Sequence, residues 1–119
     1  MTLANTLKKI KALSDLTRLR IFLLLVSYDE ICSCYFAELF GFSAPTISRH
    51  TSILCESGLI KERKESRWVF FSLNRQDKKI KYWLQLFESS LNEKDLNSDI
   101  LKMRQILGNG CKAKGCLKK

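Results

Sequence analysis

The sequence contains few of the residues that interrupt regular structure. Its 119 residues include one proline and five glycines, and no stretch is rich in serine or proline. No candidate linker separates two domains, and the length suits one compact domain. No internal repeat is found that would indicate a solenoid protein.

Long apolar runs and a secretion signal are also missing. The longest purely apolar run, Ile21–Val26, is far shorter than the ~20 residues that a membrane-spanning helix requires. The early lysines precede a segment that Asp15 and two arginines interrupt, which is unlike a signal peptide. We therefore expect no membrane partner and a location in the reducing cytoplasm. There, the five cysteines are expected to be thiols rather than disulfides.

Features of enzymes are scarce, whereas positive charge is abundant. No glycine-rich phosphate loop occurs, and no motif pairs a cysteine with a histidine or carboxylate, so we expect neither an enzyme nor an organic cofactor. The net charge is +9, and the chain remains basic without the four lysines in its last eight residues. A small basic domain is attracted to polyanions such as nucleic acid.

Apolar residues recur at helical spacing in the first half of the chain. The pattern predicts helices over residues 2–13 and about 15–27. A short helix follows and ends at Gly41, and a further helix extends from Ser43 to Gly58. Two short helices joined by a tight turn that contains glycine are typical of a helix-turn-helix.

The pattern then changes to that of strands. Residues 59–64 and 68–73 are rich in β-branched and aromatic side chains, which predicts a hairpin with a charged tip. A hairpin directly after a helix-turn-helix is a wing. Helical spacing returns from about Gln76, with a break at Asn92–Asp95.

These elements predict a mostly α fold with a small β-hairpin, which is a winged helix-turn-helix. We expect residues 1–107 to form a DNA-binding and dimerisation domain and residues 108–119 to form a flexible tail rich in cysteine and lysine. The first and final helices carry more apolar surface than so small a domain can cover. A homodimer that buries them is therefore expected.

The second helix of the pair and the hairpin tip are the candidate DNA contacts. In this motif the second helix lies in the major groove, with its early residues at base edges. Arginine suits guanine or phosphate, and serine and threonine commonly bind phosphates. A solvated polar face and a packing role for His50, the only histidine, are the alternatives. The predicted partner is double-stranded operator DNA, and the predicted contacts are Ser43, Thr46, Ser48, Arg49, His50, Lys64 and Arg67, with Arg63 close by.

A pair of cysteines precedes the first helix of the motif, whose start we expect near Tyr35. Cys32 and Cys34 are separated by one residue, so their side chains point to the same side of an extended segment. Two thiolates in this place can share one ion, and thiolates select soft ions over magnesium or calcium. Two bystander thiols are the alternative.

Three segments resemble the arsenical-resistance (ArsR/SmtB) repressor family. They are Ala12–Ile21, Ser43–His50 and Arg67–Leu73, and they occur in the family's order. Leu16 stands where the family usually has proline, a departure that costs little because proline there only preorganises the first helical turn. The resemblance implies a homodimer that leaves its operator when a thiophilic ion binds. It also implies that Cys32 and Cys34 are the metalloid ligands.

The resemblance leaves the third ligand open. Arsenic-responsive members commonly have another cysteine where this chain has Ala37, and trivalent arsenic prefers three thiolates. Cys55 is next to an apolar core position, which favours a packing role. Cys111 and Cys116 lie among lysines, which lower a thiol pKa and favour the thiolate. We expect one of these tail cysteines, from the partner subunit, to be the third ligand, with the tail of the same chain as the alternative.

No histidine follows His50, so the zinc site that some relatives build on their dimer helices is not expected. The expected inducer is As(III) or Sb(III), with Cd(II) or Pb(II) as the alternative. A repressor that responds to thiol oxidation is a further alternative.

Overall fold

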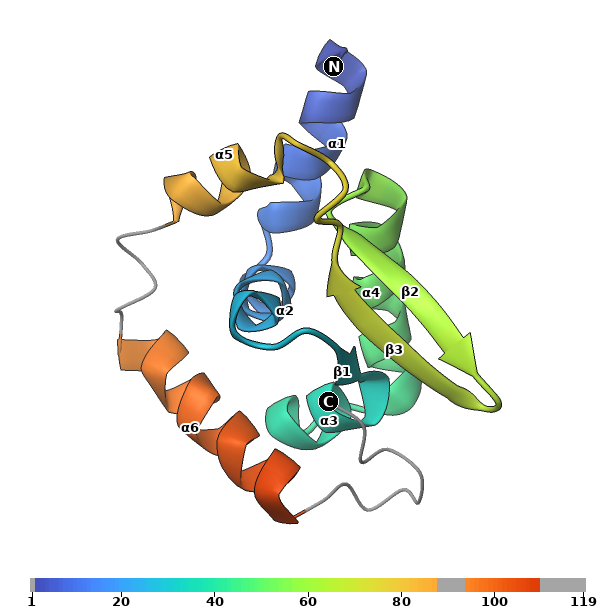
Figure 1. Ribbon diagram of the computed structural model, residues 1–119, viewed down its shortest axis with the longest axis vertical. Helices are drawn as coiled ribbons and strands as arrows, with labels where there is room; N and C mark the ends of the chain where they lie inside the picture. Colours follow the sequence, from blue (N-terminus) through green and yellow to red (C-terminus); the bar gives the residue numbers. More distant parts are fainter. Residues whose placement is uncertain (1, 88–93, 110–119) are drawn as a thin grey trace.

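The computed structural model describes residues 2–87 and 94–109 (Figure 1). It confirms the predicted winged helix-turn-helix, with helices packed around a small antiparallel sheet. In chain order the elements are α1 (Leu3–Leu13), α2 (Leu16–Ser27), β1 (Ile31–Cys32), α3 (Ser33–Phe40), α4 (Ala44–Ser57), β2 (Ile60–Glu65), β3 (Trp68–Leu73), α5 (Ile80–Leu86) and α6 (Lys94–Asn109).

Local capping signals fix the ends of the central helices. The side chains of Asp15 and Ser43 accept hydrogen bonds from the backbone N–H three residues later, at the starts of α2 and α4. Gly41 and Gly58 end α3 and α4 with φ values of 70° and 86°, in the left-handed region that glycine adopts without strain. The helix-turn-helix therefore has the boundaries that its sequence predicts, except that α3 begins at Ser33 rather than near Tyr35.

The hairpin is the predicted wing, and β1 joins it. β2 and β3 are antiparallel and connected by Ser66 and Arg67. β1 pairs with the other edge of β3, where Cys32 lies opposite Phe70. This strand was not predicted, because its two residues are too few to show a period-two pattern.

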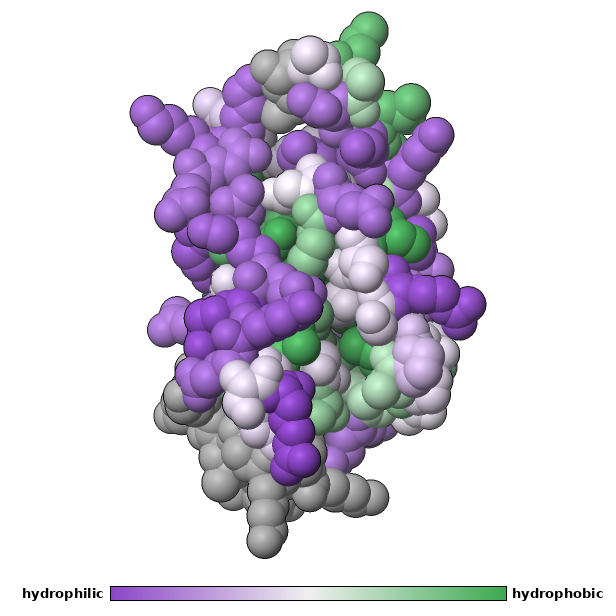
Figure 2. All heavy atoms as spheres, turned by 90° about the vertical axis from the view of Figure 1, so that its right-hand side faces the viewer, coloured by the Kyte–Doolittle hydropathy of each residue, from purple (hydrophilic) through white to green (hydrophobic). Residues whose placement is uncertain are grey.

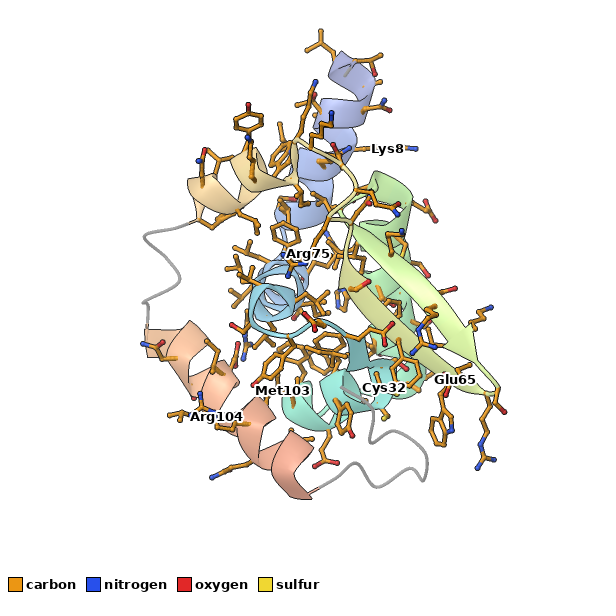
Figure 3. The ribbon with its side chains drawn as sticks, in the orientation of Figure 1. Lys8, Cys32, Glu65, Arg75, Met103 and Arg104 are labelled. Atoms are coloured by element: carbon orange, nitrogen blue, oxygen red, sulfur yellow. The ribbon has the colours of Figure 1, made fainter. Side chains whose placement is uncertain are left out.

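The core lies where α2, α3 and α4 meet the sheet. Its largest fully buried side chains are Tyr35, Phe22, Phe36, Phe70, Ile21, Leu24, Leu25, Ile31, Ile47, Leu54, Leu59 and Met103. Met103 comes from α6, which packs against α2 and α3 (Figures 1 and 3). Part of the final helix is thus covered by its own chain, although the sequence placed that helix at a dimer interface.

α6 extends to Asn109, two residues past the predicted domain boundary. The assignment of a domain to residues 1–107 and of a tail to residues 108–119 stays a prediction. None of the helices within the described residues is long and apolar enough to span a bilayer.

Candidate DNA-reading surface and cysteine pair

Helix α4 is the second helix of the helix-turn-helix, and we call it the reading helix. It presents its early polar residues on the surface. Ser43, Ser48 and Arg49 are exposed, and Thr46 is half-buried with its hydroxyl 3.0 Å from that of Ser43. Figure 2 shows the side of the molecule with α4 and the hairpin, where hydrophilic side chains predominate. A long cation and several hydroxyl groups thus face solvent together at the start of α4, the arrangement that base and phosphate contacts require.

His50 points inward from the same helix. Its Nδ1 atom is 3.4 Å from a guanidinium nitrogen of Arg18 and 3.8 Å from a carboxylate oxygen of Asp15. Its ring centroid is 6.5 Å from that of Phe42. His50 therefore connects the middle of α4 to the start of α2, and these contacts favour the packing role. Its predicted DNA contact stays a prediction.

Three exposed cations near the wing tip differ in how firmly they are held within the chain. Lys64 is 72 % exposed, and Arg67 is exposed with its guanidinium 5.1 Å from the ring centroid of Trp68. Arg63, in contrast, forms two hydrogen bonds with Glu30, of 2.7 and 2.8 Å, and one with Glu65 of 2.9 Å. These hydrogen bonds, first to Glu30 and then to Glu65, raise the pKa of Arg63 further above its already high value. Lys64 forms a long ion pair of 4.0 Å with Glu62, whereas Arg63 secures the hairpin to the segment before β1. The DNA contacts of Lys64 and Arg67 stay a prediction.

Cys32 and Cys34 meet at the junction of β1 and α3. Cys32 is buried in an extended conformation directly before the helix, and Cys34 is half-buried in the first helical turn (Figure 3). Their sulfur atoms lie 3.1 Å apart. The sulfur of Cys34 takes part in a disulfide bond, so the expectation that all five cysteines are thiols is wrong at this position. Two sulfurs that bind one ion at about 2.3 Å can be no more than ~4.6 Å apart. The change from strand to helix thus brings the two sulfurs within reach of a single ion once the disulfide bond of Cys34 is reduced.

The described residues place no third ligand beside the pair. Among them, no third histidine, cysteine or carboxylate joins the pair to form a group that could hold a metal ion. Cys55 is half-buried on α4, and its burial, with smaller contributions from Glu62 and Glu56, raises its thiol pKa to about 11. This disfavours the thiolate that a soft ion requires. Cys111 and Cys116 lie outside the described residues.

Several side chains that shape this region were not identified from the sequence. The guanidinium of Arg18 donates to the backbone carbonyl of Ala12 at 2.7 Å, which ties the end of α1 to α2. Arg20 forms an ion pair with Asp99 of α6. Both contacts depend on the tertiary fold, and no local spacing in the sequence indicates them.

Comparisons with known proteins agree with this architecture. The sequence profile of bacterial regulatory proteins of the arsR family matches residues 15–62. The chain is 45 % identical over 64 residues to an arsenical resistance operon repressor of Escherichia coli, over 54 % of this chain and 55 % of that protein. The match therefore spans about half of that relative's length.

A second relative is matched over a longer stretch. The chain is 35 % identical over 85 residues to the cadmium resistance transcriptional regulatory protein CadC of Listeria innocua, over 71 % of this chain and 67 % of that protein. Among solved structures, a homodimeric winged helix-turn-helix DNA-binding domain from Mycobacterium bovis superposes with a TM-score of 0.64 at 23 % identity. That superposition covers 76 % of this chain and 82 % of the other, and it supports the fold.

Proposed function

Since the chain belongs to the ArsR family of bacterial regulatory proteins, we propose that it is a transcriptional repressor that binds operator DNA as a homodimer and dissociates when As(III) or Sb(III) binds to Cys32 and Cys34. Its family membership confirms the resemblance found in the sequence and the expectation of a regulator rather than an enzyme. The observation that carries the proposed inducer is the 3.1 Å separation of the two sulfurs at the first turn of α3.

DNA binding is supported by the exposed cations on α4 and the wing. Arg49 lies on the solvent face of the reading helix, while Lys64 and Arg67 lie at the end of the hairpin. In the proposed complex, α4 enters the major groove and the wing contacts the adjacent minor groove or backbone. The net charge of +9 favours association with a polyanion.

A homodimer is supported by apolar side chains that remain exposed at one end of the molecule. Leu3, Leu7 and Ile10 follow one another along one face of α1, and each is at least half exposed. Tyr82 and Leu86 of α5 are also exposed, and α5 lies at the same end of the molecule as α1 (Figure 1). A solved structure of the same fold is that of a homodimeric domain.

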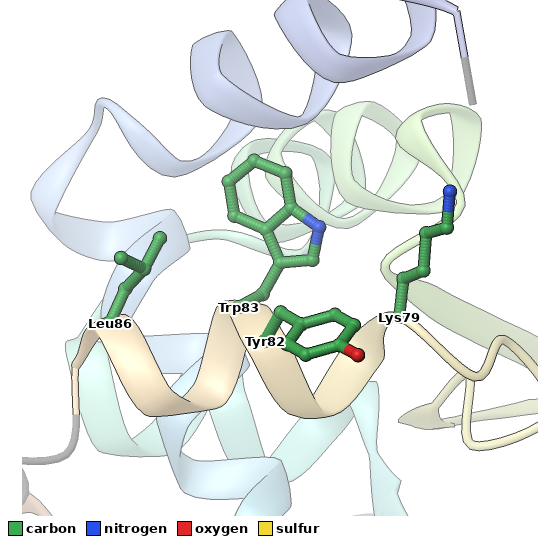
Figure 4. Close-up of a pocket in the computed structure, with 4 residues that line it drawn as sticks. All are labelled: Lys79, Tyr82, Trp83 and Leu86. Atoms are coloured by element: carbon green, nitrogen blue, oxygen red, sulfur yellow. The ribbon is translucent and has the colours of Figure 1, made fainter.

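A hollow on α5 adds to this surface. It has a volume of about 250 Å³ and is lined by Lys79, Tyr82, Trp83 and Leu86 (Figure 4). A mainly apolar hollow beside exposed leucines is suited to receive apolar side chains of a second copy. We therefore propose that α1 and α5 form the dimer interface. α6 is not assigned to it, because α6 packs against α2 and α3 of its own chain.

The third ligand is proposed to come from Cys111 or Cys116. Ala37 has no ligating atom, and burial keeps the thiol of Cys55 protonated at neutral pH. The tail follows α6 in the sequence, and α6 packs against α3 of the same chain. This packing supports a ligand from the same subunit over the partner's tail, the two routes that the sequence left open.

Release of DNA requires that the ion bind the DNA-free form more tightly. By linkage, operator DNA must then weaken ion binding by the same factor. Each ~1.4 kcal/mol of this coupling changes operator affinity tenfold. An ion bound by the sulfurs of Cys32 and Cys34 would act on the first turn of α3, the helix that packs against α4.

A repressor that responds to Cd(II) or Pb(II) is the second candidate, because a cadmium regulator is among the relatives. A gel shift on the promoter of its own operon, under strict reduction, separates the candidates by comparing arsenite, antimonite, cadmium, lead and zinc. We expect arsenite and antimonite to release DNA at the lowest concentrations. Release by cadmium or lead alone would indicate the second candidate. A parallel gel shift without reductant, in which an oxidant releases DNA although no ion does so under reduction, would indicate a thiol redox switch.

A further inference from the structure

A row of aromatic rings connects α3, the helix that begins directly after Cys32, to the reading helix. Phe36 and Phe40 stack on α3 with centroids 6.3 Å apart and ring planes 14° apart. Phe40 also stacks on Phe42, in the turn of the helix-turn-helix, at 6.1 Å and 23°. Phe42 in turn lies 6.5 Å from His50 of α4. All these separations are typical of aromatic pairs, which pack at about 4.5–7 Å.

The row begins at the proposed ion site. Cys32, Phe36 and Phe40 are spaced four residues apart, and residues with this spacing lie along one side of a helix. Cys32 directly precedes α3, and Phe36 is fully buried. A rotation or shift of the first turn of α3 therefore displaces the rings of both phenylalanines.

Phe40 is held from its other side. The guanidinium of Arg20 lies 4.8 Å from the centroid of the Phe40 ring, and Arg20 is itself fixed by its ion pair with the buried Asp99. Phe40, which is half-buried, is thus contacted by Arg20 on one side and by the rings of Phe36 and Phe42 on others, so a displacement of its ring acts on Phe42.

The far end of the row is equally constrained. His50 of α4 lies against Asp15 and Arg18 at the start of α2. A displacement of Phe42 therefore acts on α4 through His50, the residue that holds α4 to α2. Phe42 itself is 40 % exposed and lies outside the buried core. Its replacement is therefore expected to leave the domain folded.

We propose that Phe42 is a positioning residue that transmits the movement of α3 to the reading helix, and thereby sets how strongly a thiophilic ion lowers operator affinity. The inference rests on the proposed function, to which it adds the route between the ion and the DNA. It assigns no ligand or base contact to Phe42.

The test measures the ratio of operator dissociation constants with and without sodium arsenite, by fluorescence anisotropy in a phosphine reductant. Phe42→Ala is expected to reduce this ratio by roughly 2- to 30-fold, the range over which single residues alter coupling between sites. Phe42→Tyr keeps the ring and should retain the wild-type ratio. Ile53→Ala is the matched control, because Ile53 is an apolar residue of α4 with 41 % exposure that is not part of the row.

The outcomes separate this inference from the proposed function. If arsenite and cadmium both fail to release the wild-type protein from DNA, the proposed function is wrong and the inference falls with it. If wild type responds and Phe42→Ala weakens DNA binding equally with and without the ion, Phe42 is a DNA contact or a structural residue, and the inference alone is wrong. Phe42→Leu, which keeps apolar volume without a ring, provides the same test should the alanine variant not fold.

Discussion

The guanidinium group of Arg20 on α2 binds both carboxylate oxygens of Asp99 on α6, across 79 residues of sequence. The Nε atom of Arg20 is 2.5 Å from one oxygen, and a second guanidinium nitrogen pairs with the other. Asp99 is almost fully buried, whereas the side chain of Arg20 is 30 % exposed. Because a buried carboxylate depends on its partner, this ion pair ties α6 to α2.

Replacing Asp99 by alanine should destabilise the protein by about 2–3 kcal/mol. The loss of one partner of a fully buried pair costs more, but water still reaches Arg20 and reduces the penalty. The measurement is urea unfolding of both proteins at equal concentration. Gln105→Ala, on the exposed side of α6, is the control and should change stability by less than about 0.5 kcal/mol. An unchanged stability of Asp99→Ala would contradict the packing of α6 on α2.

The limits of the helix-turn-helix were predictable because their signals are local. Ser43 caps α4 through a nearby backbone N–H, and Gly41 and Gly58 adopt left-handed conformations that end helices. The wing was predictable for the same reason, since alternation and turn residues lie within a few positions of each other. Contacts between distant residues, such as that of Arg20 with Asp99, leave no such trace in one sequence.

In the candidate site, too, local features could be predicted from the sequence and tertiary contacts could not. The spacing of Cys32 and Cys34 was enough to predict that they can share an ion, but not that β1 ends at Cys32 and α3 begins at the next residue. Likewise, the polar composition of α4 indicated a DNA face, but did not reveal that His50 turns inward toward Asp15. The pairing of β1 with β3 and the packing of α2 on α4 decide these orientations.

Arg49→Ala should weaken binding to the operator by ~1–3 kcal/mol if Arg49 reads a base edge. Its effect on unrelated duplex DNA should be much smaller, because phosphate contacts from other residues remain. Competition binding with operator and scrambled duplexes measures the difference. Arg104→Ala removes an equally charged, exposed residue from α6 and serves as the control. Equal losses on both duplexes would assign Arg49 to the backbone instead.

Arg67→Ala should weaken binding to all duplexes by a similar factor, because the wing tip is expected to contact phosphate or the minor groove. One lost phosphate contact reduces the slope of log affinity against log salt concentration by about one unit. Titrations at several salt concentrations give this slope. Lys102→Ala, an exposed cation on α6, should leave the slope unchanged. If the slope of Arg67→Ala equals that of wild type, the wing does not contact the phosphates through this residue.

Cys32→Ser and Cys34→Ser should each bind the operator normally and fail to respond to arsenite. A serine hydroxyl is similar in size to the thiol but is a poor ligand for soft ions. Gel shifts in the presence of increasing arsenite provide the measurement. Cys55→Ser is the matched control, and it should remain inducible because burial raises the pKa of Cys55 to about 11 and disfavours its thiolate. If arsenite fully releases either Cys32→Ser or Cys34→Ser from DNA, the pair is not the arsenite sensor.

Truncation after Gly110 tests the source of the third sulfur. The shortened chain keeps Cys32 and Cys34 but loses both tail cysteines, so X-ray absorption should detect two As–S bonds instead of three. Repression should persist, because α4 and the wing are intact. The truncation also removes lysines, so the double variant Cys111→Ser, Cys116→Ser is the control that keeps the charge of the tail.

Mixed dimers then distinguish the two routes by which the tail can reach the pair. A dimer is formed from one subunit with Cys32→Ser and Cys34→Ser and one with Cys111→Ser and Cys116→Ser. If the tail serves its own chain, neither subunit has all three sulfurs, and three-sulfur coordination is lost. If it serves the partner, one complete site remains. We expect the loss, because α6 packs against α3 of its own chain. The truncated protein has a third possible outcome. If it still shows three As–S bonds, the third ligand is Cys55, whose side chain must then turn out of the buried position that raises its thiol pKa.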